Sequence, residues 1–271
     1  MEGRQLGRCA WPEPETGIQW AVVTAMNNVL TVLDVLEAVS IQQPVGVSEL
    51  ARSMGLPKST VQRSLETLSA AGWLQRGASG AWSLTLKPAV IGHRAGNEWS
   101  LREAAQPVMS GLRHETGETV RLWLRDGRDA VLIESIESAK TVRAITPIGS
   151  RVGLHASSAG KAILAAMADD ELDRFLTGDL HAYTDRTIVE PTKLRRTLAQ
   201  VRTRGYAQSN SEANIDVGGV AAPILSPDKR PIAAIGVVLP MHRLGADLAA
   251  QFGDLVQRAA AHVTATIEKG S

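Results

Sequence analysis

The sequence predicts an α+β protein with two domains, and three features of the chain support this class. Helical periodicity broken by turn residues predicts two short helices within residues 47–74. A β-hairpin is predicted directly after them, over residues 72–84. Strand patterns and amphipathic helices then recur from residue 101 to the C-terminus. With 271 residues, of which 44% are apolar, the chain is long enough to bury one core in each domain.

The boundaries of the two short helices follow from their capping residues. The side-chain oxygen of Ser48 can cap a helix that starts at Glu49, whose carboxylate suits the positive end of the helix. Gly55 can adopt the left-handed conformation that ends a helix. Because the fixed φ of Pro57 suits a first helical turn, we expect the second helix to start near this residue.

The second helix has one apolar and one polar side. Val61, Leu65 and Leu68 recur at helical spacing and should face a core. The opposite side carries donors of the kind that contact phosphates and base edges in the major groove of DNA. An ordinary helical hairpin with a solvated face is the alternative interpretation. If the pair reads DNA, we expect the contacts to come from Ser48, Lys58, Ser59, Thr60, Gln62, Arg63 and Arg76.

The predicted hairpin favours DNA binding over that alternative. A hairpin with the turn Gly77-Ala78-Ser79-Gly80, placed after two such helices, is typical of a winged helix-turn-helix. In such modules the hairpin lies along the duplex, so Arg76 can meet a phosphate, whereas Trp82 is expected to brace the hairpin. Residues 45–87 hold five basic and two acidic side chains, a net charge of +3, whereas the whole chain carries +1. Positive charge is therefore concentrated in this segment.

Five motifs resemble those of the IclR family of bacterial transcription regulators, and the resemblance spans residues 27–267. In chain order they are GLPKSTVQRSLETLSAAGWL, HETGETVRLWLRDGRDAVLIESIES, IGSRVGLHASSAGKAILA, RTRGYAQSNSEANIDVGGVAAPI and PIAAIGVVLPMHRL. The resemblance implies a winged helix-turn-helix, a connecting helix and a C-terminal domain whose six-stranded, GAF-like sheet binds a small molecule. It also implies dimers formed by the N-terminal modules and often tetramers formed by the C-terminal ones.

We therefore expect a mobile arm at 1–20, a DNA-binding domain at 21–86, a linker at 87–98 and an effector-binding domain at 99–271. The first helix of the DNA-binding domain is expected over 21–36. In the C-terminal domain the strand patterns fall at 120–124, 130–136, 142–146, 219–225 and 232–239. Helices are expected at 101–115, 160–168, 191–204 and 246–268.

The best local candidate for effector binding is the small-residue segment 155–161, which enters a helix. Its backbone amides can hold a carboxylate, because the first amides of a helix lack intrahelical partners. Close packing of a turn is the alternative interpretation. In the resembling family this segment borders the ligand. The resemblance implies ligand-facing roles for Thr141, Ala144, Ser158, Ala159, Gly160, Ser209, Gly219, Gly236 and Val238.

The sequence departs from the family at four of these positions. The family's site often holds an aspartate, a cysteine and two serines, whereas this chain has Ser209, Gly219, Gly236 and Val238. Fewer polar groups and smaller side chains should disfavour very small polar acids. We therefore predict an aromatic or otherwise bulky organic acid as the effector.

Other functional classes receive less support from the sequence. The one cysteine, Cys9, excludes an internal disulfide and a cysteine-based zinc site, and the six histidines lack metal-ligand spacing, so neither a metal nor a cofactor is expected. No apolar run reaches the roughly 18 residues that a membrane span needs, which favours a cytoplasmic protein. A hydrolase with Ser158 as nucleophile is an alternative, but Ala156 stands where the nucleophile elbow requires glycine. A second alternative is an interaction module whose winged part only dimerises.

Taken together, these features predict a regulator without enzymatic activity. We expect a homodimer or homotetramer that binds a palindromic double-stranded DNA operator, acts as a repressor and responds to a small organic acid. The sequence leaves open whether the ligand releases or tightens DNA binding.

Overall fold

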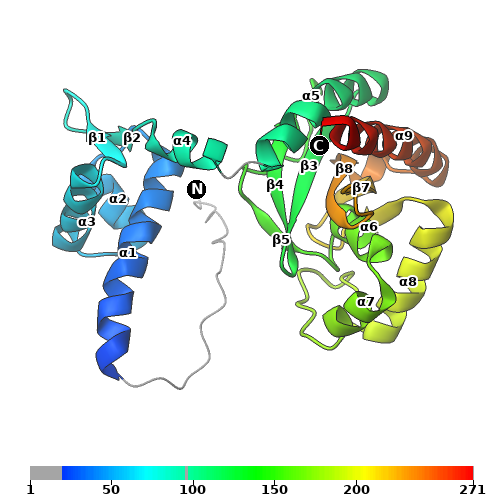
Figure 1. Cartoon of the computed structure of the whole chain (residues 1–271), viewed down its shortest axis with the longest axis horizontal. Helices are drawn as coiled ribbons and strands as arrows, with labels where there is room; N and C mark the ends of the chain where they lie inside the picture. Colours follow the sequence, from blue (N-terminus) through cyan, green and yellow to red (C-terminus); the bar gives the residue numbers. More distant parts are fainter. Residues whose placement is uncertain (1–19, 95–96, 271) are drawn as a thin grey trace, which may run out of the picture. The chain divides into compact units, whose positions relative to one another are not determined.

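The computed structural model describes residues 20–94 and 97–270. The chain divides into two compact units, of which the first ends at Ala95 and the second begins at Gly96 (Figure 1). This division falls within the linker expected at 87–98. The arm expected at 1–20 lies outside the described residues except for Trp20, where the first helix begins.

The N-terminal unit is a winged helix-turn-helix, as predicted. It contains α1 (Trp20–Gln42), α2 (Val47–Met54), α3 (Lys58–Ala70), β1 (Leu74–Arg76), β2 (Trp82–Leu84) and α4 (Lys87–Arg94). Gly55 ends α2 with a φ of 65°, in the left-handed region as expected. The apolar side of α3, formed by Val61, Leu65 and Leu68, is buried in one core with α1, α2 and the hairpin.

The start of α2 differs from the prediction, because Ser48 does not cap the helix. The helix begins at Val47, after Gly46, and no side chain caps it. Val45 and Trp82 exchange two backbone hydrogen bonds of 3.0 and 2.9 Å, which fix the extended backbone just before the helix. This tertiary contact, which the local pattern did not reveal, places Ser48 inside the first turn with an exposed side chain.

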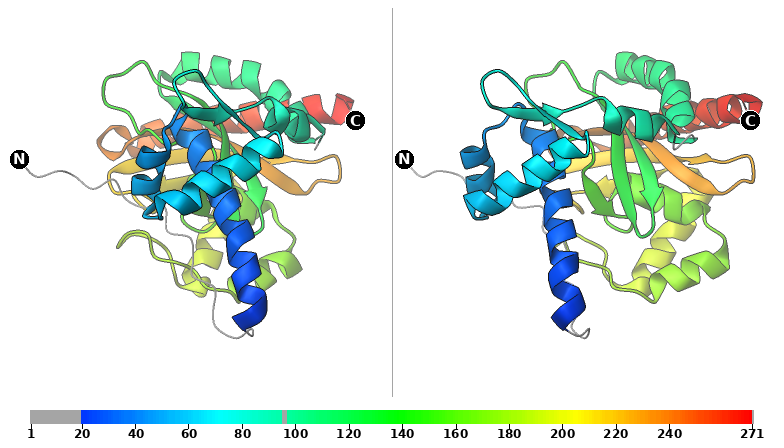
Figure 2. Two further views of the ribbon diagram at one scale, coloured as in Figure 1. Left: turned by 90° about the vertical axis from the view of Figure 1, so that its left-hand side faces the viewer. Right: turned by 60° about the vertical axis from the view of Figure 1, so that its left-hand side comes forward.

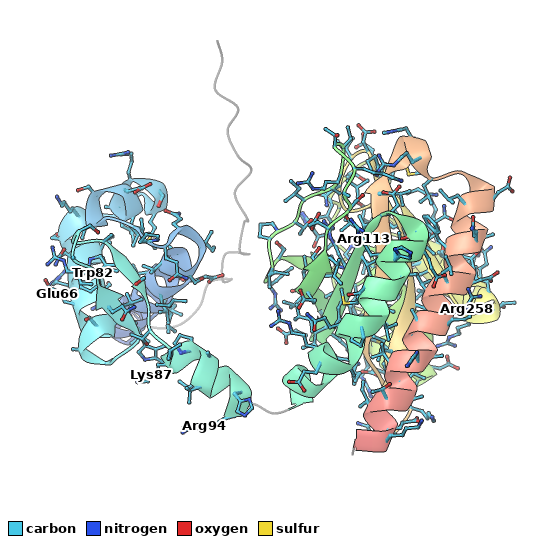
Figure 3. The ribbon with its side chains drawn as sticks, turned by 90° about the horizontal axis from the view of Figure 1, so that it is seen from above. Glu66, Trp82, Lys87, Arg94, Arg113 and Arg258 are labelled. Atoms are coloured by element: carbon cyan, nitrogen blue, oxygen red, sulfur yellow. The ribbon has the colours of Figure 1, made fainter. Side chains whose placement is uncertain are left out.

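The hairpin is closed and braced by Trp82, as the sequence predicts. Leu74 pairs with Leu84 and Arg76 pairs with Trp82 across the two strands. The indole of Trp82 is only 4% exposed, so its role in this unit is structural. Figure 3 shows Trp82 within the N-terminal unit and Glu66 at its edge.

The segment expected as a linker begins with the helix α4, which contains no buried residue. Its first residue is nevertheless fixed to the end of α3. The Nζ of Lys87 donates to the carbonyl of Ala71 over 2.6 Å and lies 5.2 Å from the ring centre of Trp73. The hydroxyl of Thr85 donates to Gly72 and accepts from the amide of Lys87. The start of α4 is therefore fastened to the rest of the N-terminal unit.

The C-terminal unit contains a six-stranded antiparallel sheet in the order β5-β4-β3-β8-β7-β6. The strands are β3 (Thr119–Asp126), β4 (Asp129–Ile136), β5 (Arg151–Gly153), β6 (Ala207–Asn210), β7 (Val217–Leu225) and β8 (Pro231–Pro240). The helices are α5 (Asn97–Thr116), α6 (Ser158–Ala166), α7 (Asp169–Leu176), α8 (Pro191–Arg204) and α9 (Ala246–Gly270), with a short 3₁₀ turn at Met241–Arg243.

Helices cover both faces of this sheet. The helices α5 and α9 lie against one face, and α6 lies against the other with α7 and α8 packed around it (Figure 2). Alternating side chains of β3 therefore enter two different cores, with Val120 and Leu122 on the α5/α9 side and Trp123 on the α6 side. Arg121, on the same face as Trp123, is buried as well.

The strand predicted at 142–146 is wrong, because this segment forms a loop. The edge of β4 that it would have joined already pairs with β5, and Leu132 exchanges backbone hydrogen bonds with Gly149 and Ser150. Val142 and Ile145 of the loop are 60% and 72% exposed. The short strands β5 and β6 were not predicted as elements, because three or four residues are too few to show periodicity. The helix α7, with eight residues, was not predicted either.

Gly160 is required where α6 meets the preceding segment. A Cβ at this position would lie 2.2 Å from the carbonyl oxygen of Leu154 and 2.4 Å from its Cα, and a backbone cannot move away as a flexible side chain can. We expect Gly160→Ala to lower the free energy of unfolding by about 2 kcal/mol or more, measured by denaturant titration. Gly111→Ala is the matched control, because a Cβ there meets nothing within 4 Å inside α5. Alanine should stabilise that helix by about 1 kcal/mol. Equal effects of the two changes would contradict this account.

Candidate nucleic-acid interface and effector site

The polar side of α3 forms a continuous exposed surface. Lys58, Ser59, Arg63 and Glu66 are exposed as predicted, whereas Thr60 and Gln62 are half-buried. Their spacing places Ser59, Gln62, Arg63 and Glu66 one helical turn apart on the same side. The hydroxyl groups of Ser59 and Thr60 lie at the N-terminal end of this helix, and the guanidinium of Arg63 follows one turn later. This arrangement fits a major groove of DNA.

Two of the predicted DNA contacts are already engaged within the unit. The side-chain amide of Gln62 donates to the carboxylate of Glu66 over 2.5 Å. The guanidinium of Arg76 donates to the carbonyl of Gly80 over 3.3 Å and lies 5.7 Å from the ring centre of Trp82. Arg76 is therefore held at the turn of the hairpin, which is the place expected for a phosphate contact from a wing.

In the C-terminal unit the strand register brings the predicted ligand-facing residues of the sheet together. Ser209 pairs with Gly219, Gly219 pairs with Val238, and Val238 pairs with Thr119. Directly paired residues of antiparallel strands face the same side, so these four form one row across β6, β7, β8 and β3. Gly236 lies in the next row, where it pairs with Arg121. Sequence reasoning missed Thr119 and Arg121.

The small residues Gly219 and Gly236, from which the sequence predicted a bulky ligand, leave no open space beside the sheet. A Cβ at Gly219 would lie 2.8 Å from the hydroxyl oxygen of Ser158. A Cβ at Gly236 would lie 2.7 Å from the Cβ of Ala221. Neighbouring side chains therefore fill the space that the missing side chains leave.

The N-terminal end of α6 closes over this row of residues. The hydroxyl of Ser157 caps the helix by accepting from the amide of Gly160 over 3.0 Å, so this amide is already satisfied. Ser158 and Ala159 occupy the first turn, and both are buried. Ser209 donates to the carbonyl of Ala156 over 3.4 Å and thereby joins β6 to the same segment.

His155 holds the segment before α6 in place. Its ring is 4% exposed, and its Nε2 lies 2.8 Å from the carbonyl oxygen of His181. Burial lowers the pKa of His155, and the hydrogen bond to His181 opposes this shift. The neutral ring therefore donates to that carbonyl and fixes the loop around residue 181 against the segment before α6.

A buried ion pair joins α6 to the turn after β6. Both carboxylate oxygens of Glu212 lie 2.6 Å from the Nζ of Lys161, whose side chain is 1% exposed. Burial lowers the pKa of Lys161, and the charge of Glu212 opposes this shift. The backbone carbonyl of Glu212 accepts from the hydroxyl of Thr187, so the loop before α8 is tied to the same point.

Arg121 is the other buried cation of this unit, and its surroundings differ from those of Lys161. It is 3% exposed, and its Nη2 donates to the carbonyl of Ala144 over 2.8 Å. Its Nε has no hydrogen-bond partner among the described residues. Burial lowers the pKa of Arg121, and the charge of Glu137 opposes this shift. The contact with Ala144 places the loop 139–150, including the predicted residues Thr141 and Ala144, beside β3.

A separate groove of about 370 Å³ lies between α5 and α9. Figure 3 shows Arg258 on α9, which is one of the residues that line it. These helices cover the face of the sheet opposite to α6, so the groove does not contain any of the predicted ligand-facing residues.

Other kinds of site are not found in the described part of the chain. Residues 20–94 and 97–270 contain no group of three or more side chains that could hold a metal ion. None of the helices described there is long and apolar enough to cross a bilayer.

The two units define a class of protein, a winged helix-turn-helix regulator that carries a separate sheet domain. Comparison with known proteins narrows this class. A model of the IclR helix-turn-helix domain matches residues 29–78, and a model of the C-terminal domain of bacterial transcriptional regulator IclR matches residues 93–265. The chain therefore belongs to the IclR family of transcriptional regulators.

Individual relatives agree with this assignment. The transcriptional repressor IclR of Escherichia coli K12 is 34% identical over 224 residues, which cover 81% of this chain and 82% of that protein. The repressor AllR of the same organism is 32% identical over 270 residues, which cover 98% and 97% of the two chains. The crystal structure of the Thermotoga maritima IclR superposes with a TM-score of 0.75 at 26% identity, covering 90% of this chain and 99% of the other. These proteins are regulators and not enzymes, so the hydrolase alternative based on Ser158 is not supported.

The ion pair of Lys161 and Glu212 can be tested by changing its members one at a time. Glu212→Leu leaves a buried ammonium group without its partner and should lower the free energy of unfolding by about 3–5 kcal/mol in denaturant titrations. The double variant Lys161→Met with Glu212→Leu removes both charges and should be more stable than the Glu212→Leu single variant. A double variant that is less stable than Glu212→Leu would show that the charges are not what couples the two residues.

Proposed function

We propose that this protein is a transcriptional repressor that binds a palindromic DNA operator through α3 and the hairpin and responds to a small organic acid in its C-terminal unit. The observation that carries the proposal is the exposed polar side of α3, which stands next to a hairpin that holds a guanidinium at its turn. A second unit, with its own cores, contains a row of sheet residues beneath the end of a buried helix. Reading and sensing are thereby assigned to different units.

For DNA reading we assign Arg63 to a base edge and Arg76 to a phosphate. Arg63 is exposed on the same side of α3 as Ser59, near the end that enters a groove in helix-turn-helix proteins. Gln62 must exchange its hydrogen bond with Glu66 for one with a base. Ser48, exposed in the first turn of α2, is proposed to meet the DNA backbone.

For sensing, we propose an organic acid bound by Thr141, Ala144 and the row formed by Ser209, Gly219 and Val238, with Ser158, Ala159 and Gly236 beside it. The exposed Thr141 and the half-buried Ala144 and Val238 mark the side that opens to solvent. Ser158 fills the space beside Gly219, and Ala221 fills the space beside Gly236, so the two glycines do not make room for an aromatic ring. Support for an aromatic acid comes instead from the apolar residues around the site.

The proposed assembly is a dimer formed by the N-terminal units, or a tetramer built from two such dimers. Large apolar side chains are exposed on this unit in two groups, Val29, Leu30 and Leu33 on α1, and Leu86, Val90 and Ile91 at α4. Apolar surface of this kind is typical of protein interfaces. A dimer places two copies of α3 on successive turns of a palindromic site.

Binding of the full-length protein to its own promoter region and to random duplex DNA, at several salt concentrations, tests the function. We expect a specific site that is bound more tightly than random DNA, with an affinity that falls as salt rises. Arg63→Ala should cost about 1–3 kcal/mol and relax the preference for one base pair. Arg76→Ala should weaken specific and random DNA by similar factors.

Arg174→Ala is the matched control, because Arg174 is an exposed arginine of α7 in the C-terminal unit. This change should leave both affinities as they are. Uniform loss of affinity for Arg63→Ala and Arg76→Ala would refute the assignment of base reading to Arg63. A protein that binds its promoter region no better than random DNA would instead support the alternative of a module that only dimerises.

A further inference from the structure

Arg121 is a buried cation that forms no ion pair with any residue that the structure describes. Of its donors, Nη2 meets the carbonyl of Ala144, whereas Nε meets no acceptor in the described part of the protein. Among the described residues, no carboxylate lies within the 4.0 Å of an ion pair with Arg121. Buried charges in proteins are normally paired, because removing a charge from water is costly unless an opposite charge or several hydrogen bonds replace the solvent.

The nearest acidic group, Glu137, is already engaged by other residues. Its carboxylate accepts from the hydroxyl of Ser135 over 2.7 Å and from that of Thr119 over 3.3 Å. It also lies 3.8 Å from the Nε of Arg143. Glu137 therefore acts on Arg121 at a distance and leaves its Nε free, in contrast to Glu212, which contacts Lys161 directly.

The position of Arg121 in the sheet places this guanidinium at the candidate effector site. It pairs with Gly236 of β8 and therefore faces the same side of the sheet. Its contact with Ala144 shows that the loop 139–150 lies over it. Thr141 of this loop is exposed and Ala144 is half-buried, so a small molecule can reach this edge of the site from solvent.

We propose that Arg121 binds the carboxylate of the effector and thereby makes the site selective for anions. The proposal rests on the function proposed above and adds a residue that the family resemblance does not assign to the ligand. Guanidinium groups bind carboxylates through parallel N–H donors, and such charge-assisted hydrogen bonds are stronger than those between neutral groups. The carboxylate supplies the acceptor and the negative charge that the protein does not provide at Nε.

The test compares acids with neutral molecules of the same shape. Formate, acetate, glyoxylate, pyruvate and benzoate, together with the primary amide of each, are titrated into the full-length protein by calorimetry, with thermal shift as a second readout. We expect at least one acid to bind and its amide not to bind. Arg121→Met should weaken binding of that acid by about tenfold to a hundredfold. Arg121→Lys, which keeps the charge but loses the planar pair of donors, should bind more weakly than the wild type and still prefer the acid to the amide.

The matched control is Arg125→Met, because Arg125 lies on the same strand but already forms an ion pair with Glu171. It should leave acid binding unchanged. Without ligand, Arg121→Met should unfold at a temperature no lower than the wild type, because it removes a buried charge that has no carboxylate partner.

Several results would overturn the proposal. The wild type could bind no acid, or it could bind an acid and its amide equally well. The variant Arg121→Met could bind the acid with wild-type affinity, or it could lose marked stability in the absence of ligand. Promoter binding of all variants is measured in parallel without acid. Failure of the wild type to bind its promoter would refute the proposed function, while the acid titrations would still decide the role of Arg121.

Discussion

The ion pair between Lys161 and Glu212 is the constraint on which the sensing unit depends. Both charged groups are removed from water, so they are tolerated only while α6 and the turn after β6 stay in register. On the same helix, Ser158 lies close to Gly219 of β7. The same turn receives the hydroxyl of Thr187, so one point fixes a helix, a strand end and a long loop.

The buried cations Lys161 and Arg121 differ in the groups that they contact. Lys161 is neutralised by a carboxylate of the protein and serves the fold, whereas Arg121 is held by one backbone carbonyl on the side where the loop 139–150 reaches solvent. A sheet covered on both faces allows this arrangement. Each strand contributes alternate side chains to two cores, so a charged residue on either face needs a specific partner.

Much of the fold could be predicted from the sequence where periodicity was long or turn residues were distinctive. The apolar stripe of α3 and the turn at Gly55 appear as expected. The predictions failed where tertiary contacts decide. Because Val45 and Trp82 form backbone hydrogen bonds, α2 begins before Ser48. Because β4 pairs with β5, residues 142–146 have no strand to pair with.

The candidate effector site shows the same limit. The family resemblance supplied Ser209, Gly219 and Val238, and the strand register places them in one row. Arg121 was missed because the alternation along β3 does not show that both faces of the strand are covered, which only the packing of α6 reveals. A signal was available for Lys161, since it is the single charged residue within the apolar helix SAGKAILAA.

The contacts of Lys87 bear on how a signal reaches the DNA. Lys87 is the first residue of α4, and it grips the C-terminal end of α3 through Ala71 and Trp73. The helix that leaves the winged unit is therefore fixed to the end of the helix that carries Arg63. A force on the far end of α4 would reach α3 through this contact.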